Sequence, residues 1–235
     1  MKNFKKILLT VLIYSIAMGF LEAIVVVYLR DIYYPHGFKF PLMIIPDSTL
    51  QVEILREFCT LVMLAAIAVI AGKNKLEMFS YFLFSFAVWD LTYYIGLKLI
   101  LNWPSSFLTW DILFLIPVPW IGPVLAPVIS SILMVILSLL FLFLQRKQEK
   151  FQVKFAEWIL IYSGAVVIFL SFIWNYAEII ISNNLLKNIF SLKQSSFIEI
   201  SRQYIPTYFH WEIFLVGVFS ISVSIFLIFR RYGRN

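Results

Sequence analysis

Six long runs of apolar residues dominate the sequence and restrict what it can fold into. A helix needs about 20 apolar residues to cross about 30 Å of hydrocarbon. Hydrophobic residues make up 62% of the chain and charged residues 14%, against about 45–50% and about 25% in soluble domains. Because lipid cannot satisfy exposed backbone polar groups, we predict an all-α fold, a polytopic membrane helix bundle. The predicted spans lie near residues 7–29, 55–72, 77–100, 121–144, 156–182 and 210–229.

No linker, low-complexity segment or repeat divides the chain, so we expect one integral membrane domain over residues 1–235. The basic start MKNFKK resembles that of a signal peptide. The apolar run after it is too long for one, however, and no small-x-small cleavage pattern follows. We therefore interpret this run as a retained first span.

Lysine and arginine are distributed unevenly between the segments that join the predicted spans. Twelve of the 19 fall on one side of the membrane, in the two termini and in short connections. The other seven are spread over longer segments on the opposite side. Because short basic connections stay in the cytoplasm, the pattern predicts both termini there (N-in, C-in). We expect the membrane to be a bacterial cytoplasmic (inner) membrane.

The three longer connections are expected on the extracytoplasmic side, with interfacial helices. Residues 30–54 are rich in aromatic residues and proline, with a helix predicted to start near Ser48 or Thr49. Residues 105–116 are predicted to form a short interfacial helix, followed by a bent return at PVPWIGP. Residues 183–209 contain an amphipathic stretch that we expect to lie on the membrane surface.

The sequence does not support several classes of site. Two distant histidines and the single Cys59 form neither a histidine-rich zinc site nor an intrachain disulfide. Phosphate-loop, dinucleotide and hydrolase motifs are absent. The net charge of +6 comes from clusters between spans, so no nucleic-acid partner is predicted. No cofactor or metal site is predicted either; the one alternative left open is Mg²⁺ or Mn²⁺ bound by carboxylates with His210.

The most informative polar residues are acids inside or beside the predicted spans. A charged group in hydrocarbon is costly, so such residues mark a functional site by default. Glu22, Asp90 and Glu178 belong to different spans, yet each lies in the half that faces away from the cytoplasm. Glu57 opens the second span on the same side. We predict a shared polar cavity in which these four acids are the catalytic residues.

Other polar and aromatic residues at the same depth are candidates for substrate binding. Asp90, Tyr94 and Lys98 are four residues apart and share one helical face. Basic side chains and histidine could bind an anionic headgroup, and tryptophans could form its walls or anchor the chain at the interface. The candidate binding residues are Arg56, Lys98, Tyr94, Asn175, His210, Trp110 and Trp120.

A structural explanation of the same residues remains open at this point. Arg56 and Lys98 could neutralise neighbouring acids in ion pairs that only fix helix packing. Asp111 is interpreted as a solvated or capping residue of the interfacial helix. His36 is interpreted as an exposed histidine in a loop.

The segment WDLTYYIGLKLILNWP, with the following LTWDILFLIPVPWIGPVLAP, resembles a segment of small multi-span bacterial membrane proteins of unassigned function. The resemblance covers about a fifth of the chain. It implies no activity, and no functional residue is carried over from it.

Three functions are compatible with the sequence. The first is a membrane-embedded enzyme that uses carboxylate acid–base chemistry on a lipid or isoprenoid-like substrate. The second is an ion-coupled small-molecule transporter, whose site would need a route to both faces. The third is a non-catalytic membrane assembly subunit. The expected partners are membrane lipids and a lipid-like or small-molecule ligand.

Overall fold

The computed structural model describes residues 2–43, 45–148, 150–182 and 205–232. Its described part contains six helices that are long and apolar enough to cross a membrane. This confirms the all-α polytopic bundle, and we treat the chain as an integral membrane protein. The helices are α1 (Lys2–Tyr33), α2 (Asp47–Ala71), α3 (Lys75–Leu101), α4 (Leu125–Lys147), α5 (Phe155–Ser182) and α7 (Trp211–Tyr232).

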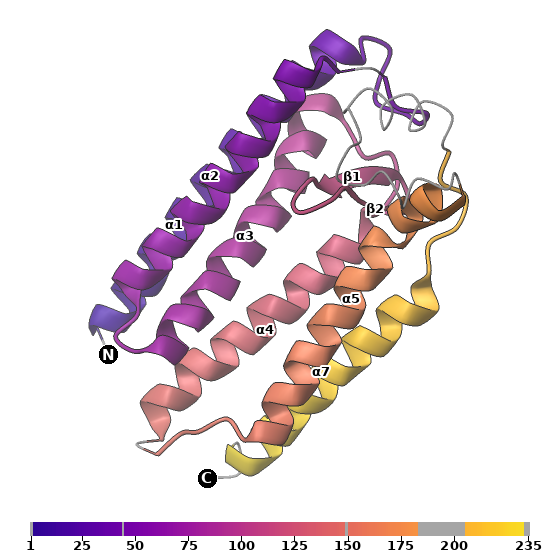
Figure 1. Cartoon of the computed structure of the whole chain (residues 1–235). Helices are drawn as coiled ribbons and strands as arrows, with labels where there is room; N and C mark the ends of the chain where they lie inside the picture. Colours follow the sequence, from indigo (N-terminus) through magenta and orange to yellow (C-terminus); the bar gives the residue numbers. More distant parts are fainter. Residues whose placement is uncertain (1, 44, 149, 183–204, 233–235) are drawn as a thin grey trace.

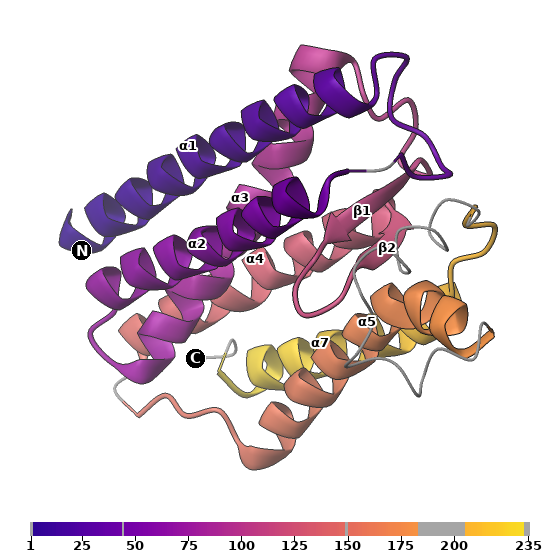
Figure 2. The same cartoon turned by 45° about the horizontal axis from the view of Figure 1, so that its top comes forward.

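The helices form two groups joined by α4. Helix α3 packs against α1, α2 and α4, while α5 pairs with α7 (Figure 1). The chain begins and ends at the same end of the bundle (Figure 1). The opposite end carries the strands β1 (Trp110–Phe114) and β2 (Trp120–Pro123) and the connection between α1 and α2 (Figure 2). We call this opposite end the hairpin end.

The ends of α2 and α3 follow from local sequence signals. Helix α2 begins at Asp47, directly after Pro46, and thus extends beyond the predicted apolar span. Helix α3 begins after Asn74, whose side-chain oxygen accepts a hydrogen bond from the backbone N–H of Glu77 at 2.9 Å. It ends at Leu101, and the following Asn102 has a left-handed φ of 52°.

Helices α1 and α3 approach each other closely because Gly19 has no side chain. A Cβ atom at this position would lie 2.5 Å from the carbonyl oxygen of Trp89 and 2.7 Å from the Cβ of Thr92. Glu22 follows one turn later on α1. The contact at Gly19 therefore fixes the depth of Glu22 relative to α3.

The two strands correct one prediction. They pair antiparallel, with Asp111 opposite Gly122, so the expected interfacial helix over residues 105–116 is wrong. The segment is rich in aromatic and β-branched residues, and the prolines of PVP interrupt any helix at its end. A lone hairpin is only marginally stable. This one packs on the bundle, where Trp120 stacks on Phe172 of α5 with ring centroids 5.7 Å apart.

The amphipathic surface stretch expected within residues 183–209 lies outside the described residues, and only the last five residues of this connection are described. Residues 205–209 form neither helix nor strand and lead directly into α7.

Candidate functional site

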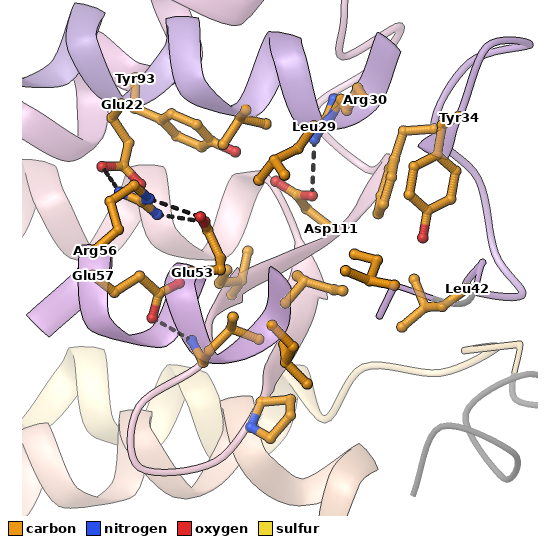
Figure 3. Close-up of a pocket in the computed structure, with 18 of the residues that line it drawn as sticks. Glu22, Leu29, Arg30, Tyr34, Leu42, Glu53, Arg56, Glu57, Tyr93 and Asp111 are labelled. Carbon is orange, nitrogen blue, oxygen red and sulfur yellow. Dashed lines mark hydrogen bonds and ion pairs between the residues drawn. The ribbon is translucent and has the colours of Figure 1, made fainter. Parts of the chain in front are cut away.

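A cavity of about 180 Å³ lies at the hairpin end, between α1, α2, α3, the hairpin and the connection that follows α1 (Figure 3). Most of its wall is apolar, but seven acidic or basic side chains also line it. We call it the charged cavity. These side chains are Glu22, Glu53, Glu57, Asp90, Asp111, Arg30 and Arg56.

Arg56 lies between two acids in this cavity. Its Nε and Nη2 atoms donate to the carboxylate of Glu53 at 2.9 and 2.6 Å, and its Nη1 donates to Glu22 (Figure 3). Glu53 and Arg56 meet because they are three residues apart on α2, whereas Glu22 reaches them from α1. Glu22 is only 7% exposed. The single positive charge of the Arg56 guanidinium is thus shared between two carboxylates.

Glu57 joins the helices to the hairpin. It lies one turn after Glu53 on α2, and its Oε2 accepts a hydrogen bond from the backbone N–H of Leu115 at 2.9 Å (Figure 3). Its side chain is buried, and it makes no ion pair with any described residue. A single neutral donor is therefore its direct hydrogen-bond partner in the described part of the chain.

Asp90 has a similar environment on α3. Its Oδ2 accepts a hydrogen bond from the hydroxyl of Ser131 on α4 at 2.7 Å. Like Glu57, it has no ion-pair partner among the described residues. An ionised carboxylate away from water needs a paired cation or several hydrogen bonds. Glu57 and Asp90 are thus the two acids of the cavity best placed to exchange a proton with a ligand.

Arg30 and Asp111 form a second charged group, nearer the hairpin. The Nη2 atom of Arg30 lies 3.2 Å from Oδ1 of Asp111, and the hydroxyl of Tyr94 donates to Oδ2 at 3.4 Å. Asp111 is 2% exposed. Burial raises the pKa of this carboxyl group to about 6, although the Arg30 guanidinium and the hydrogen bonds lower it.

A second, apolar cavity of about 340 Å³ lies between α3, α4, α5, α7 and the hairpin. Phenylalanine, leucine, isoleucine and tryptophan side chains form most of its wall. Trp89, Asp90 and Leu113 line both cavities. Asp90 is therefore a wall residue of both the charged cavity and the apolar cavity.

The structure brings together part of the site predicted from sequence. Glu22, Glu57, Asp90 and Arg56 all line the charged cavity. Tyr94 does not line it directly but bonds to Asp111, which does. Trp120 lines the apolar cavity.

The other predicted site residues are not part of either cavity. Lys98 is exposed and donates to the carbonyl oxygens of Asn102 at 3.3 Å and Pro104 at 3.0 Å, where it stabilises the end of α3. Glu178 is exposed near the end of α5, and Asn175 is buried on the same helix.

His210 and Trp110 also lie outside the two cavities. The Nδ1 atom of His210 is 2.7 Å from the carboxylate of Glu212, close to the start of α7. Trp110 packs edge-to-face against Phe209, with ring centroids 6.3 Å apart. Among the described residues, no group of three or more His, Cys, Asp and Glu side chains could hold a metal ion. The cation site with His210 that the sequence left open is therefore not found.

Two functional candidates were not recognised as such in the sequence. In the sequence, Arg30 has the position of an ordinary charged residue at the end of a span. Asp111 has the position of a solvated residue on a surface helix. The two meet because β1 places Asp111 beside Arg30 of α1 and Tyr94 of α3. The strand that contains Asp111 could have been predicted from the aromatic and β-branched residues around it, because such residues favour strands.

Comparisons with protein-family models, with curated proteins and with solved structures find no match for this chain. The fold and the site therefore define only a class: an integral membrane protein with six long apolar helices in its described part, and with a charged and an apolar cavity that share Asp90 as a wall residue.

Proposed function

We propose that this chain is a membrane-embedded enzyme that acts on a lipid or isoprenoid-like amphiphile. One observation carries the proposal: the charged cavity and the apolar cavity share Asp90 as a wall residue. An amphiphile could place its polar group beside Arg56 and Arg30 and its apolar chain among the side chains of α3, α4 and α5. The bond between the two parts would then lie at Asp90.

Asp90 and Glu57 are the proposed acid–base groups. Proton transfer by a positioned carboxyl group contributes about 10²–10⁴-fold to a rate. Asp90 would donate a proton to the reacting atom or accept one from it, and the Ser131 hydroxyl would hold its carboxyl group in place. Arg56, fixed between Glu22 and Glu53, would orient the polar part of the substrate.

We further propose that the hairpin end faces away from the cytoplasm, in a bacterial inner membrane, as the distribution of lysine and arginine indicates. In a Cys59→Ser background, a membrane-impermeant maleimide should label Lys39→Cys in intact cells. It should label Lys150→Cys only after the cells are permeabilised. The opposite labelling pattern would reverse the orientation and move the charged cavity to the cytoplasmic side.

Filling the apolar cavity is expected to prevent amphiphile binding. Ala165 on α5 lines this cavity, whereas the adjacent Val166 is 55% exposed on the outer surface of the bundle. We expect Ala165→Trp to reduce the lipid retained by the purified protein at least tenfold, because the indole occupies the volume of the chain. Native mass spectrometry measures the retained lipid.

Val166→Trp is the matched control, since it adds the same indole to the same helix but on its exposed side. It should retain lipid as the unchanged protein does. Equal lipid retention by both variants would contradict a site in the apolar cavity.

An ion-coupled carrier is the second candidate, and one observation favours it: the charged cavity has five carboxyl groups and only two guanidinium groups. Such an excess of acids could bind protons or cations. Met18, Leu64 and Trp89 form an apolar cluster on the side of the cavity toward the chain termini, which opposes a continuous polar route. Asp90-dependent proton flux into sealed vesicles would favour the carrier over the enzyme.

A further inference from the structure

Arg30 has a hydrogen-bond donor that the described chain does not use. The residue lies in the last turn of α1, is 7% exposed and lines the charged cavity. Its Nη2 bonds to Asp111, but its Nη1 is buried and has no hydrogen-bond partner among the described residues. Leaving a charged donor buried and unpaired is costly. A ligand that supplies a hydrogen-bond acceptor for Nη1 would remove this cost.

Two aromatic rings pack against this guanidinium. Its Cζ atom lies 3.7 Å from the ring centroid of Trp103 and 4.5 Å from that of Phe38. Such cation–π contacts hold the cationic group against the rings, and its N–H groups can still donate hydrogen bonds. A planar guanidinium held in this way is suited to bind an oxyanion such as phosphate or carboxylate.

Asp111 does not accept from the unused donor. One of its oxygens accepts from Nη2 of Arg30 and the other from the hydroxyl of Tyr94. Nη1 is therefore the guanidinium donor left for a ligand to bond.

We infer that Arg30 binds the oxyanion headgroup of the amphiphile through Nη1, at the hairpin end of the charged cavity. This inference rests on the proposed function, because the chain of the same amphiphile would occupy the apolar cavity. It adds the chemical class of the headgroup, an oxyanion, and the residue that recognises it. Arg56 is held by two acid partners and can act on the substrate through its charge, whereas Arg30 has a buried donor without a partner among the described residues.

The negative charge of Asp111 opposes an incoming anion, so binding should depend on pH. The groups around Asp111 are Arg30 from α1, Asp90, Tyr93 and Tyr94 from α3, and Tyr34 from the connection after α1. Among them Asp111 is the acid bonded to Arg30, so its charge acts most directly on an anion at this guanidinium. Its raised pKa of about 6 means that it gains a proton as the pH falls through this value. An anion should therefore bind more tightly at pH 5 than at pH 8.

The test uses dioctanoyl phosphatidylglycerol, a phosphodiester whose charge is constant between these pH values, with the full chain in detergent and native mass spectrometry as the readout. Dioctanoylglycerol is the neutral probe, and inorganic phosphate is the free anion. We expect the double variant Arg30→Gln/Asp111→Asn to bind the phosphodiester about ten- to hundredfold more weakly, as for loss of a charged hydrogen bond. Removing both charges avoids leaving Asp111 buried without its partner.

The single variant Asp111→Asn shows whether Arg30 binds the anion or only pairs with Asp111 to stabilise the fold. If Arg30 binds the anion, this variant should bind the phosphodiester at least as tightly as the unchanged protein and with a weaker dependence on pH. Arg146→Gln is the control, since Arg146 also bonds to one acid, at 3.4 Å, and lies over a phenylalanine ring, but at the opposite end of the bundle. It should leave binding unchanged.

Unchanged phosphodiester binding by the double variant would overturn the role of Arg30. Equal affinity for dioctanoylglycerol would overturn an oxyanion headgroup. Binding of inorganic phosphate as tight as that of the phosphodiester would overturn the amphiphile and identify a free anion as the ligand. Loss of lipid in Ala165→Trp together with full binding by the double variant would leave the proposed function standing while this inference fails.

Discussion

Replacing Arg56 by Gln is expected to destabilise the protein by about 3–5 kcal/mol, the usual cost of removing one partner of a buried ion pair. Arg56 bonds to Glu22 of α1 and to Glu53 of its own helix. Without the guanidinium, two carboxylates face each other away from water. The side chains of Arg56 and Glu22 are 19% and 8% exposed, so solvent screens the repulsion only weakly. Denaturation of the purified protein in detergent, followed by circular dichroism, measures the change.

The companion variants show whether charge is the cause. Arg56→Gln combined with Glu22→Gln and Glu53→Gln should recover most of the lost stability, because no uncompensated charge remains. Arg146→Gln should cost less than Arg56→Gln, since Arg146 is 30% exposed and makes a longer contact of 3.4 Å. If the triple variant is as unstable as Arg56→Gln, packing rather than charge determines the effect.

The largest expected effect on activity is that of Asp90→Asn. The amide can still accept the hydrogen bond from Ser131, so the fold should be retained, but it cannot exchange a proton. Turnover should fall by about 10²–10⁴-fold, as for loss of a general acid or base. The assay incubates the purified protein in vesicles of a bacterial total lipid extract and follows new lipid species by mass spectrometry.

Glu178→Gln is the control for this experiment. The sequence placed Glu178 beside Asp90 in the predicted site, but the structure places it outside both cavities. Its variant should turn over lipid at the rate of the unchanged protein. Full turnover by Asp90→Asn, or loss of turnover in Glu178→Gln, would contradict the assignment of Asp90 as the acid–base group.

The helices could be predicted from the sequence because each is specified locally. Length and hydropathy alone locate a spanning helix, and local turn and capping residues such as Pro46 and Asn74 mark the ends of α2 and α3. The depth of each residue within its predicted span could also be read from the sequence. This depth placed Glu22, Glu57, Asp90 and Arg56 at the same height in the membrane. These four residues share the charged cavity.

The remainder of the site depends on long-range packing that no local pattern encodes. Depth does not say which way a helix face points, so Glu178 and Asn175 were grouped with acids whose cavity they do not line. Asp111 is separated from Arg30 by 81 positions, and the two meet only because β1 lies near the end of α1. Lys98 shares a helical face with Tyr94, yet its long side chain reaches the end of α3 instead.

Photo-crosslinking tests most directly whether the two cavities form one amphiphile site. The probe is a phosphodiester lipid with a diazirine at the end of one chain, bound to the purified protein and mapped by peptide mass spectrometry. We predict that labels concentrate on the apolar-cavity residues of α4 and α5, such as Met134 and Ala165, and disappear in Ala165→Trp. Labels confined to exposed residues such as Ile132 and Val166, at equal yield in Ala165→Trp, would contradict the proposed site.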